Sequence, residues 1–121
     1  MADAVLADRS TLDTHLVAGR LSWTSERQAS LHSICLFGEL DLATAPAVHD
    51  ELTRVEADDA DAIMLDLSNL TFMDSTGVRL LIQANTRSRT SDGRLTLLRG
   101  PAAVQRVMEL SGVDVLLPFA D

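Results

Sequence analysis

The spacing of apolar residues predicts an alternation of strands and helices along the chain. A nearly continuous apolar run at 62–67 is typical of a strand covered on both faces. The polar residues 24–28 are expected to form a turn between the first two strands. Strands are predicted at 16–23, 31–37, 62–67, 94–98 and 113–117.

Three segments between these strands have helical spacing. Thr44, with Pro46 in the first turn, marks the start of the first helix. Pro101 opens the last helix, and Gly112 is placed to end it. The middle helix opens after Asp74 and ends before the turn at 91–93. The residues expected to face inward are Val48, Leu52 and Val55 in the first helix, Val78, Leu81 and Ile82 in the second, and Val104, Val107 and Met108 in the third.

The predicted order is β-β-α-β-α-β-α-β, which indicates an α/β fold in a single domain. Strand–helix–strand units with short loops require right-handed crossovers, so we expect a small, mixed and mostly parallel sheet flanked by helices. Residues 1–14 are polar and lack periodicity. They are predicted to form a flexible leader to a domain at 15–121.

Composition narrows the range of functions. The 121 residues carry a net charge of −8, which disfavours a nucleic acid partner because its phosphates would be repelled. All ten basic residues are arginine, so a phosphate-binding lysine or a Schiff-base lysine is excluded. Cys35 is the only cysteine, and no stretch is long enough to span a membrane. We expect a cytoplasmic protein without a metal site, a cofactor or a membrane partner.

Charge is also uneven along the sequence. Nine acidic residues and a single basic one, Arg54, lie between Glu39 and Asp66, whereas six arginines lie between Arg79 and Arg106. The asymmetry indicates either a protein partner that is steered by charge or helix surfaces that simply happen to be charged. The sequence leaves both possibilities open.

The polar corner Asp74-Ser75-Thr76-Gly77 follows an apolar strand and opens the second helix. The N–H groups and the dipole at a helix N-terminus favour negative charge, so this corner can hold a phosphate or receive one. Each of the first three residues can instead be an N-cap, worth about 1 kcal/mol. Gly77 lowers helix stability by roughly 0.5–1 kcal/mol relative to alanine. We infer that its missing side chain lets a backbone or a partner approach Ser75.

A hydrolase is the enzymatic alternative. Ser75 would need a general base, but Asp74 is its direct neighbour and poorly placed, and the histidines at 15, 32 and 49 are scattered. The chain has no Gly-x-Ser-x-Gly elbow and no metal-ligand spacing. We therefore expect no catalytic residue; a hydrolase would require ester turnover that Ser75→Ala abolishes.

Two blocks of the sequence carry a family resemblance. The first, at 38–46, reads GELDLATAP, and the second, at 65–78, reads LDLSNLTFMDSTGV. Together with the strand order they resemble, over about residues 16–117, the STAS domain of bacterial anti-anti-sigma factors, also called anti-sigma factor antagonists. The first block resembles the strand-to-helix segment of that family, and the second resembles its phosphorylation loop.

The resemblance implies a partner switch controlled by phosphorylation. The serine after the motif aspartate, here Ser75, would be phosphorylated by the anti-sigma factor, a serine kinase of the GHKL type. The unphosphorylated protein would bind this kinase and free the sigma factor, and a PP2C-type phosphatase would act on the phosphorylated form. ATP and magnesium would belong to the kinase and not to this chain.

The same resemblance implies the other site residues. Asp41, after the second predicted strand, is expected near the Ser75 loop, and Arg79 stands where many members have a small residue, which changes the partner surface. A STAS subunit of another assembly, such as a lipid-transport complex or a stress-signalling scaffold, is the alternative that would use this corner as a contact surface. The implied loop and partner-binding residues are Asp41, Asp74, Thr76, Gly77 and Arg79.

Overall fold

The computed structural model describes residues 11–120, the side chains of residues 11–18 excepted. Within this range strands and helices alternate after an initial run of three strands. The elements are β1 (Thr11–Ala18), β2 (Leu21–Gln28), β3 (Leu31–Leu40), α2 (Ala45–Glu56), β4 (Ala62–Met73), α3 (Ser75–Arg89), β5 (Leu95–Leu98), α4 (Ala102–Leu110) and the 3-10 helix η1 (Asp114–Leu116).

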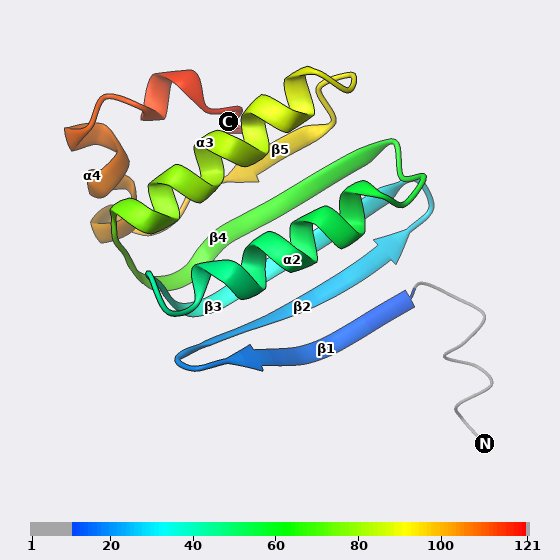
Figure 1. Cartoon of the computed structure of the whole chain (residues 1–121), viewed down its shortest axis with the longest axis horizontal. Helices are drawn as coiled ribbons and strands as arrows, with labels where there is room; N and C mark the ends of the chain where they lie inside the picture. Colours follow the sequence, from blue (N-terminus) through cyan, green and yellow to red (C-terminus); the bar gives the residue numbers. More distant parts are fainter. Residues whose placement is uncertain (1–10, 121) are drawn as a thin grey trace.

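The strands form one sheet in the order β1-β2-β3-β4-β5. The pairs β1–β2 and β2–β3 are antiparallel, whereas β3–β4 and β4–β5 are parallel. The expected mixed α/β sheet is therefore confirmed, although its parallel pairs do not outnumber its antiparallel ones, because an N-terminal hairpin is added. Figure 1 shows α2 and α3 on the same face of the sheet, as two crossovers of the same hand require.

The N-terminal hairpin differs most from the sequence prediction. The segment 16–23 is not a single strand, because the chain turns at Gly19, where φ is 62°. Strand β2 then continues through 24–28, where the sequence predicts a turn. The polar residue Ser25 faces inward in this strand and is buried, because His32 on the next strand hydrogen-bonds its hydroxyl. A polar residue that faces the core breaks the alternation on which the prediction depends.

The start of the domain is also earlier than predicted. Strand β1 begins at Thr11, so residues 11–14 belong to the sheet and not to a leader. The remainder of the predicted leader, residues 1–10, lies outside the described residues.

The predicted last strand at 113–117 is wrong. Gly112, with φ of 75°, ends α4 as expected, but residues 114–116 then form the 3-10 helix η1. Only a single parallel bridge from Phe119 to Leu97 extends the sheet at this edge. Val115 and Leu116 are 81% and 69% exposed, whereas Val113 and Leu117 at the two ends of the segment contact the core.

The core lies between the sheet and the helices. All three inward residues predicted for α2 are buried, as are Val78 and Leu81 of α3. Ile82 is 38% exposed, so that prediction is wrong, and Leu80 is buried instead. In α4, Val104 and Met108 are fully buried, and Val107 is partly buried against the core.

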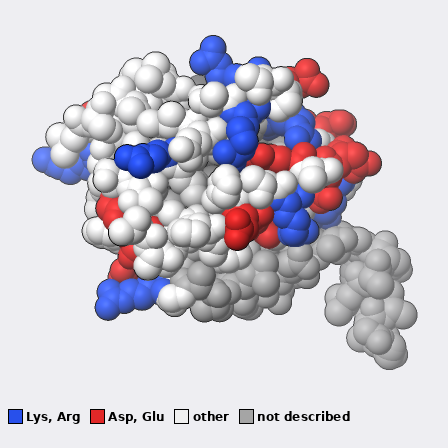
Figure 2. All heavy atoms as spheres, in the orientation of Figure 1, with Lys and Arg blue, Asp and Glu red and all other residues white. Residues whose placement is uncertain are grey.

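The two oppositely charged stretches of the sequence pair with each other. Arg87 of α3 binds Glu56 of α2 through two hydrogen bonds of 3.0 Å. Arg94 donates to the backbone oxygens of Glu56 and Ala60, at 2.9 and 2.7 Å. Figure 2 accordingly shows acidic and basic side chains interleaved near the end of α2. Part of the charge asymmetry therefore serves to hold the elements together.

Candidate functional site

The two motif blocks meet where β3 and β4 end side by side. Leu40 pairs with Met73 in the parallel register, and the backbone N–H of Asp74 donates to the oxygen of Leu40 at 3.2 Å. The carboxyl ends of parallel strands lie at one edge of a sheet, so the loops that follow them are neighbours. Asp41 and Asp74, the first residues after these two strands, are thus brought together.

Asp74 is the residue that caps α3. Its backbone is extended, and its Oδ1 accepts hydrogen bonds from the N–H groups of Thr76 at 2.9 Å and Gly77 at 3.3 Å. Among the described residues, the hydroxyls of Ser75 and Thr76 make no side-chain hydrogen bond. The sequence allowed any of the three polar residues to be the cap, and the structure assigns that role to the carboxylate.

This cap also changes the electrostatics expected for a phosphate at the corner. The N–H groups of Thr76 and Gly77 already donate to Asp74, and that of Val78 donates to the backbone oxygen of Asp74. A phosphate on Ser75 cannot use these donors without displacing the cap. The favourable helix N-terminus that the sequence indicates is therefore largely occupied.

Close packing within the fold explains why position 77 is a glycine. It is buried, and a Cβ at this position would lie 2.7 Å from Cγ of Met73 and 3.1 Å from Cγ of Leu40. The missing side chain thus lets the first turn of α3 pack on the ends of β3 and β4. The inference that Gly77 opens access for a partner is corrected accordingly.

The Asp41 loop is held by its own side chains. Oδ1 of Asp41 accepts from the N–H groups of Ala43 at 3.0 Å and Thr44 at 3.1 Å. The hydroxyl of Thr44 donates to the backbone oxygen of Glu39 at 2.9 Å and accepts from the N–H of Asp41 at 2.9 Å. These bonds fix the loop that carries Leu42, whose side chain is 74% exposed.

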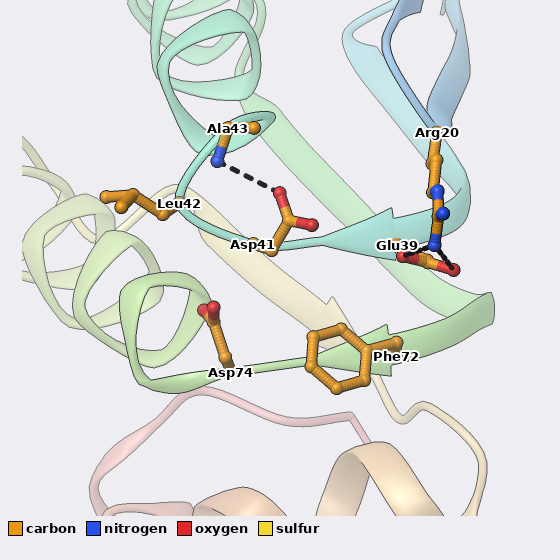
Figure 3. A pocket seen from close by; sticks show the side chains of 7 residues that line it. All are labelled: Arg20, Glu39, Asp41, Leu42, Ala43, Phe72 and Asp74. Carbon is orange, nitrogen blue, oxygen red and sulfur yellow. Dashed lines mark hydrogen bonds and ion pairs between the residues drawn. The ribbon is translucent and has the colours of Figure 1, made fainter.

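An open hollow connects the two loops (Figure 3). Asp41 and Asp74 both line it, and Phe72, 46% exposed, stands beside them. On its far side Arg20 and Glu39 form an ion pair of 3.3 Å. The hollow therefore carries three carboxylates against one guanidinium, together with two exposed apolar side chains. The residues that line it are Arg20, Glu39, Asp41, Leu42, Ala43, Phe72 and Asp74.

Arg79 lies on the other side of the corner, in a groove between α2 and α3. Its side chain is exposed and projects from the second turn of α3, and Thr76 lines the same groove. All six site residues expected from the sequence thus lie on or beside one corner of the molecule. The groove is lined by Leu42, Ala45, Pro46, His49, Asp50, Thr76, Arg79, Leu80 and Gln83.

Neither of the two histidines whose side chains are described, His32 and His49, hydrogen-bonds Ser75. The side chain of His15 lies outside the described residues, and His49 is exposed on α2. His32 is buried at the opposite end of β3, where its Nε2 hydrogen-bonds the hydroxyl of Ser25 at 2.5 Å. Ser25 is only 1% exposed, so this serine–histidine pair cannot be reached by a substrate.

Ser25, His32 and Glu51 form a buried polar cluster. Burial and neighbouring charges set the pKa values of His32 and Glu51. Burial, helped by the Arg54 guanidinium, lowers the pKa of His32 below its usual 6.5, so the contact of 3.9 Å to Asp58 is not an ion pair at neutral pH. Burial also acts to raise the pKa of Glu51, but hydrogen bonds from Arg54 and Ser25 outweigh it and lower the pKa overall. The sequence prediction missed this cluster because its members meet only in the folded sheet and helix.

The described residues contain neither a metal-binding cluster nor a membrane-spanning helix. Within 11–120 no group of three or more histidine, cysteine, aspartate or glutamate side chains is arranged to hold a metal ion. No helix in the same range has the length and apolar character needed to cross a membrane.

Comparison with known proteins defines the class. The family model described as "Mlab, STAS domain" matches residues 23–118. The chain belongs to the STAS domain family, as its two motif blocks and its mixed sheet indicate.

Two of the similar proteins are anti-sigma factor antagonists. The anti-sigma-B factor antagonist of Staphylococcus aureus is 29% identical over 90 residues, which cover 74% of this chain and 83% of that protein. The structure resembles an anti-sigma factor antagonist from Mycobacterium paratuberculosis, with a TM-score of 0.73 and 25% identity over 82% of this chain and 84% of the other.

A third similar protein has been solved in two states. The Bacillus protein SpoIIAA, an anti-sigma factor antagonist, matches in its unphosphorylated form with a TM-score of 0.67 and 27% identity, over 82% of this chain and 88% of the other. Its phosphorylated form matches with a TM-score of 0.62 and 26% identity, over 82% and 91%.

Proposed function

We propose that this protein is an anti-sigma factor antagonist that is switched off by phosphorylation of Ser75. In its unphosphorylated form it binds an anti-sigma factor, a serine kinase of the GHKL type, and thereby frees a sigma factor. The kinase supplies ATP and magnesium and phosphorylates Ser75, after which the complex dissociates. A PP2C-type phosphatase returns the protein to its binding form.

The observation that carries this proposal is the state of the Ser75 hydroxyl. Ser75 is exposed at the start of α3, and its hydroxyl makes no hydrogen bond within residues 11–120, because Asp74 caps the helix alone. A kinase acts on a hydroxyl that it can reach. At this corner the acceptor is presented without any need to open a strand or a helix.

The surroundings of Ser75 fit a protein contact better than a small ligand. The open hollow beside it combines exposed Leu42 and Phe72 with the carboxylates of Asp41 and Asp74. Exposed apolar side chains with a charged rim are typical of surfaces that bind another protein. The partner surface proposed here is therefore the hollow together with the first turn of α3.

The charges explain how one phosphate can end the interaction. Phosphorylation adds about −1.5 to −2 charge units beside Asp74 and Asp41. Because the donors of the helix N-terminus are already used by Asp74, less of this charge is compensated there. Repulsion and desolvation of roughly 3 kcal/mol at an interface are enough to lower affinity more than a hundredfold. The fold does not have to change.

Incubation with the cognate kinase and ATP, followed by mass spectrometry, tests the acceptor. The wild-type protein should gain one phosphate on Ser75, and Ser75→Ala should gain none while still binding the kinase. Thr76→Ala is the matched control, since it removes the neighbouring hydroxyl and should leave the labelling intact. Labelling of Thr76 alone, or none at all, would refute the assignment.

The second candidate is a STAS subunit of another assembly, such as a lipid-transport complex or a stress-signalling scaffold. The family model that matches is described by the name Mlab, which favours keeping this candidate. The same corner would then be a contact surface for a different partner. Affinity purification distinguishes the two: a GHKL kinase is expected, and a transporter ATPase in its place would favour the second candidate.

A further inference from the structure

Arg79 is one of three arginines whose guanidinium makes no contact within residues 11–120. Nine arginines lie within the described residues, and six of them bind a carboxylate, a backbone oxygen or an aromatic ring. Arg79, Arg89 and Arg106 make no such contact within residues 11–120. Of these three, only Arg79 lies in the first two turns of α3, next to the proposed acceptor.

The spacing of Ser75 and Arg79 places both residues on one face of α3. Residues four apart on a helix lie on one face, and an acidic group placed N-terminal to a basic one gives the better orientation. Both residues are exposed on α3, and Arg79 and Thr76 line the same groove, so the guanidinium can approach the hydroxyl of Ser75 without moving the backbone.

Other sources of positive charge at this corner are already engaged. The N–H groups of Thr76 and Gly77 donate to Asp74, and Arg20 across the hollow pairs with Glu39. Three carboxylates, those of Glu39, Asp41 and Asp74, line the hollow beside Ser75. An unpaired cation one helical turn away is therefore the available group that can offset its charge.

We infer that Arg79 is the internal counter-ion of a phosphate on Ser75. This inference rests on the proposed function, since it assigns a partner within the chain to the proposed modification. In the phosphorylated protein Arg79 turns from the groove toward the phosphate and holds part of its charge. Arg79 thereby stabilises the phosphorylated protein and reduces the repulsion that the carboxylates exert.

The test is the second ionisation of the phosphate, followed by phosphorus NMR. Phosphoserine is incorporated at position 75 during translation, so no kinase is needed. The charged and titratable groups that line the hollow and the groove on the two sides of this corner are Arg79 and Asp74 at the start of α3, Asp41 on its loop, Glu39 and Arg20 across the hollow, and His49 and Asp50 on α2. Only the contribution of Arg79 is varied, by comparing the parent protein with R79Q.

The pKa of the phosphoserine is expected to rise in R79Q by on the order of 0.2–0.4 unit, because a nearby cation favours the dianion. R89Q is the matched control: it removes another unpaired arginine of the same helix, at the far end, and should leave the phosphate unchanged. An equal pKa in R79Q and R89Q would overturn the inference.

A binding measurement tests the other explanation for an unpaired Arg79, which is that it contacts an acidic group of the partner. If R79Q leaves the phosphate unchanged and instead weakens binding of the unphosphorylated protein to the kinase, Arg79 contacts a partner acid and the inference fails. Because phosphoserine is placed by translation, failure of the kinase to label Ser75 would sink the proposed function without altering this result. The two ideas can therefore fail independently.

Discussion

Two serines of this protein lie in opposite surroundings. Ser25 on β2 is buried, and its hydroxyl is hydrogen-bonded to His32 near the start of β3. Ser75 lies at the other end, exposed at the first turn of α3 and without a side-chain hydrogen bond among the described residues. Carboxylates lie near both serines, but near Ser25 they are matched by Arg54, whereas near Ser75 they are in excess.

The difference shows what separates a buried structural hydroxyl from an accessible one. A buried hydroxyl must be hydrogen-bonded, and the partners that satisfy it also make it inaccessible. An exposed hydroxyl beside an independent cap contributes little to the fold and remains available for modification. The changes below test this contrast, from the largest expected effect to the smallest.

Removal of the Ser25 hydroxyl should lower the free energy of unfolding more than removal of the Ser75 hydroxyl. Ser25→Ala leaves Nε2 of the buried His32 without its partner, and we expect a loss of about 2–3 kcal/mol in the free energy of unfolding. Ser75→Ala is the matched change and should stay within about 0.5 kcal/mol. Denaturant unfolding measures both. Equal losses would mean that Ser75 also has a structural role and would break the comparison.

Gly77→Ala tests how tightly the proposed site is packed on the sheet. The added methyl group meets Met73 and Leu40 at distances that require these side chains to shift. We expect a loss of about 1–2 kcal/mol, since overpacking outweighs the better helix propensity of alanine. Thermal unfolding provides the measurement. A stabilised variant would instead support the inference that Gly77 lets a partner approach Ser75.

The buried cluster should make stability depend on pH. The pKa of His32 is lower in the folded protein than its unfolded value near 6.5, so below that pH the unfolded chain binds more protons. Stability should therefore fall as pH decreases from about 6.5 toward the folded pKa of His32. Glu51, whose pKa is lowered from 4.5, adds a further loss below that value.

Substitution of His32 isolates this dependence. His32→Gln lowers stability at neutral pH through the altered bond to Ser25, but the slope between about pH 6.5 and 5 should become flatter. Unfolding free energies at several pH values supply the slope. His49→Gln, on the exposed face of α2, is the control and should keep the original slope. An unchanged slope in His32→Gln contradicts the assignment.

Ser75→Glu should have the smallest effect on stability. Glutamate adds negative charge at the first position of α3, where no buried contact is lost. We expect the melting temperature to change by less than about 2 °C, while affinity for the kinase falls. A large loss of stability would indicate that Ser75 is mainly structural.

Elements with strong local signals could be predicted from the sequence. Pro46 lies in the first turn of α2 and Pro101 directly precedes α4, so both mark helix starts, and the apolar run at 62–67 is a strand with alternate residues buried. The N-terminal hairpin could not be predicted, because Ser25 can face the core only once the side chain of His32 on the neighbouring strand hydrogen-bonds its hydroxyl. Similarly, Val115 and Leu116 have the composition of a strand but follow a helix end too closely to pair along the sheet.

In the site, too, some features have local sequence signals and others depend on the folded structure. The polar corner and its motif residues are visible in the sequence, and the resemblance brings Asp41 to them. Two features depend on how α3 sits on the strand ends and are not visible in the sequence. One is that Asp74 caps the helix, and the other is that Met73 and Leu40 leave no room for a side chain at position 77. The isolation of Arg79 likewise follows from where the other arginines find partners in the folded chain.

The central claim is that phosphate on Ser75 controls binding without altering the fold. It is tested most directly by titrating the cognate kinase with two forms of the protein, one unmodified and one with phosphoserine at position 75. The account predicts an affinity at least about a hundredfold lower for the phosphorylated form, with melting temperatures within about 2 °C of each other. Equal affinities for the two forms would contradict it.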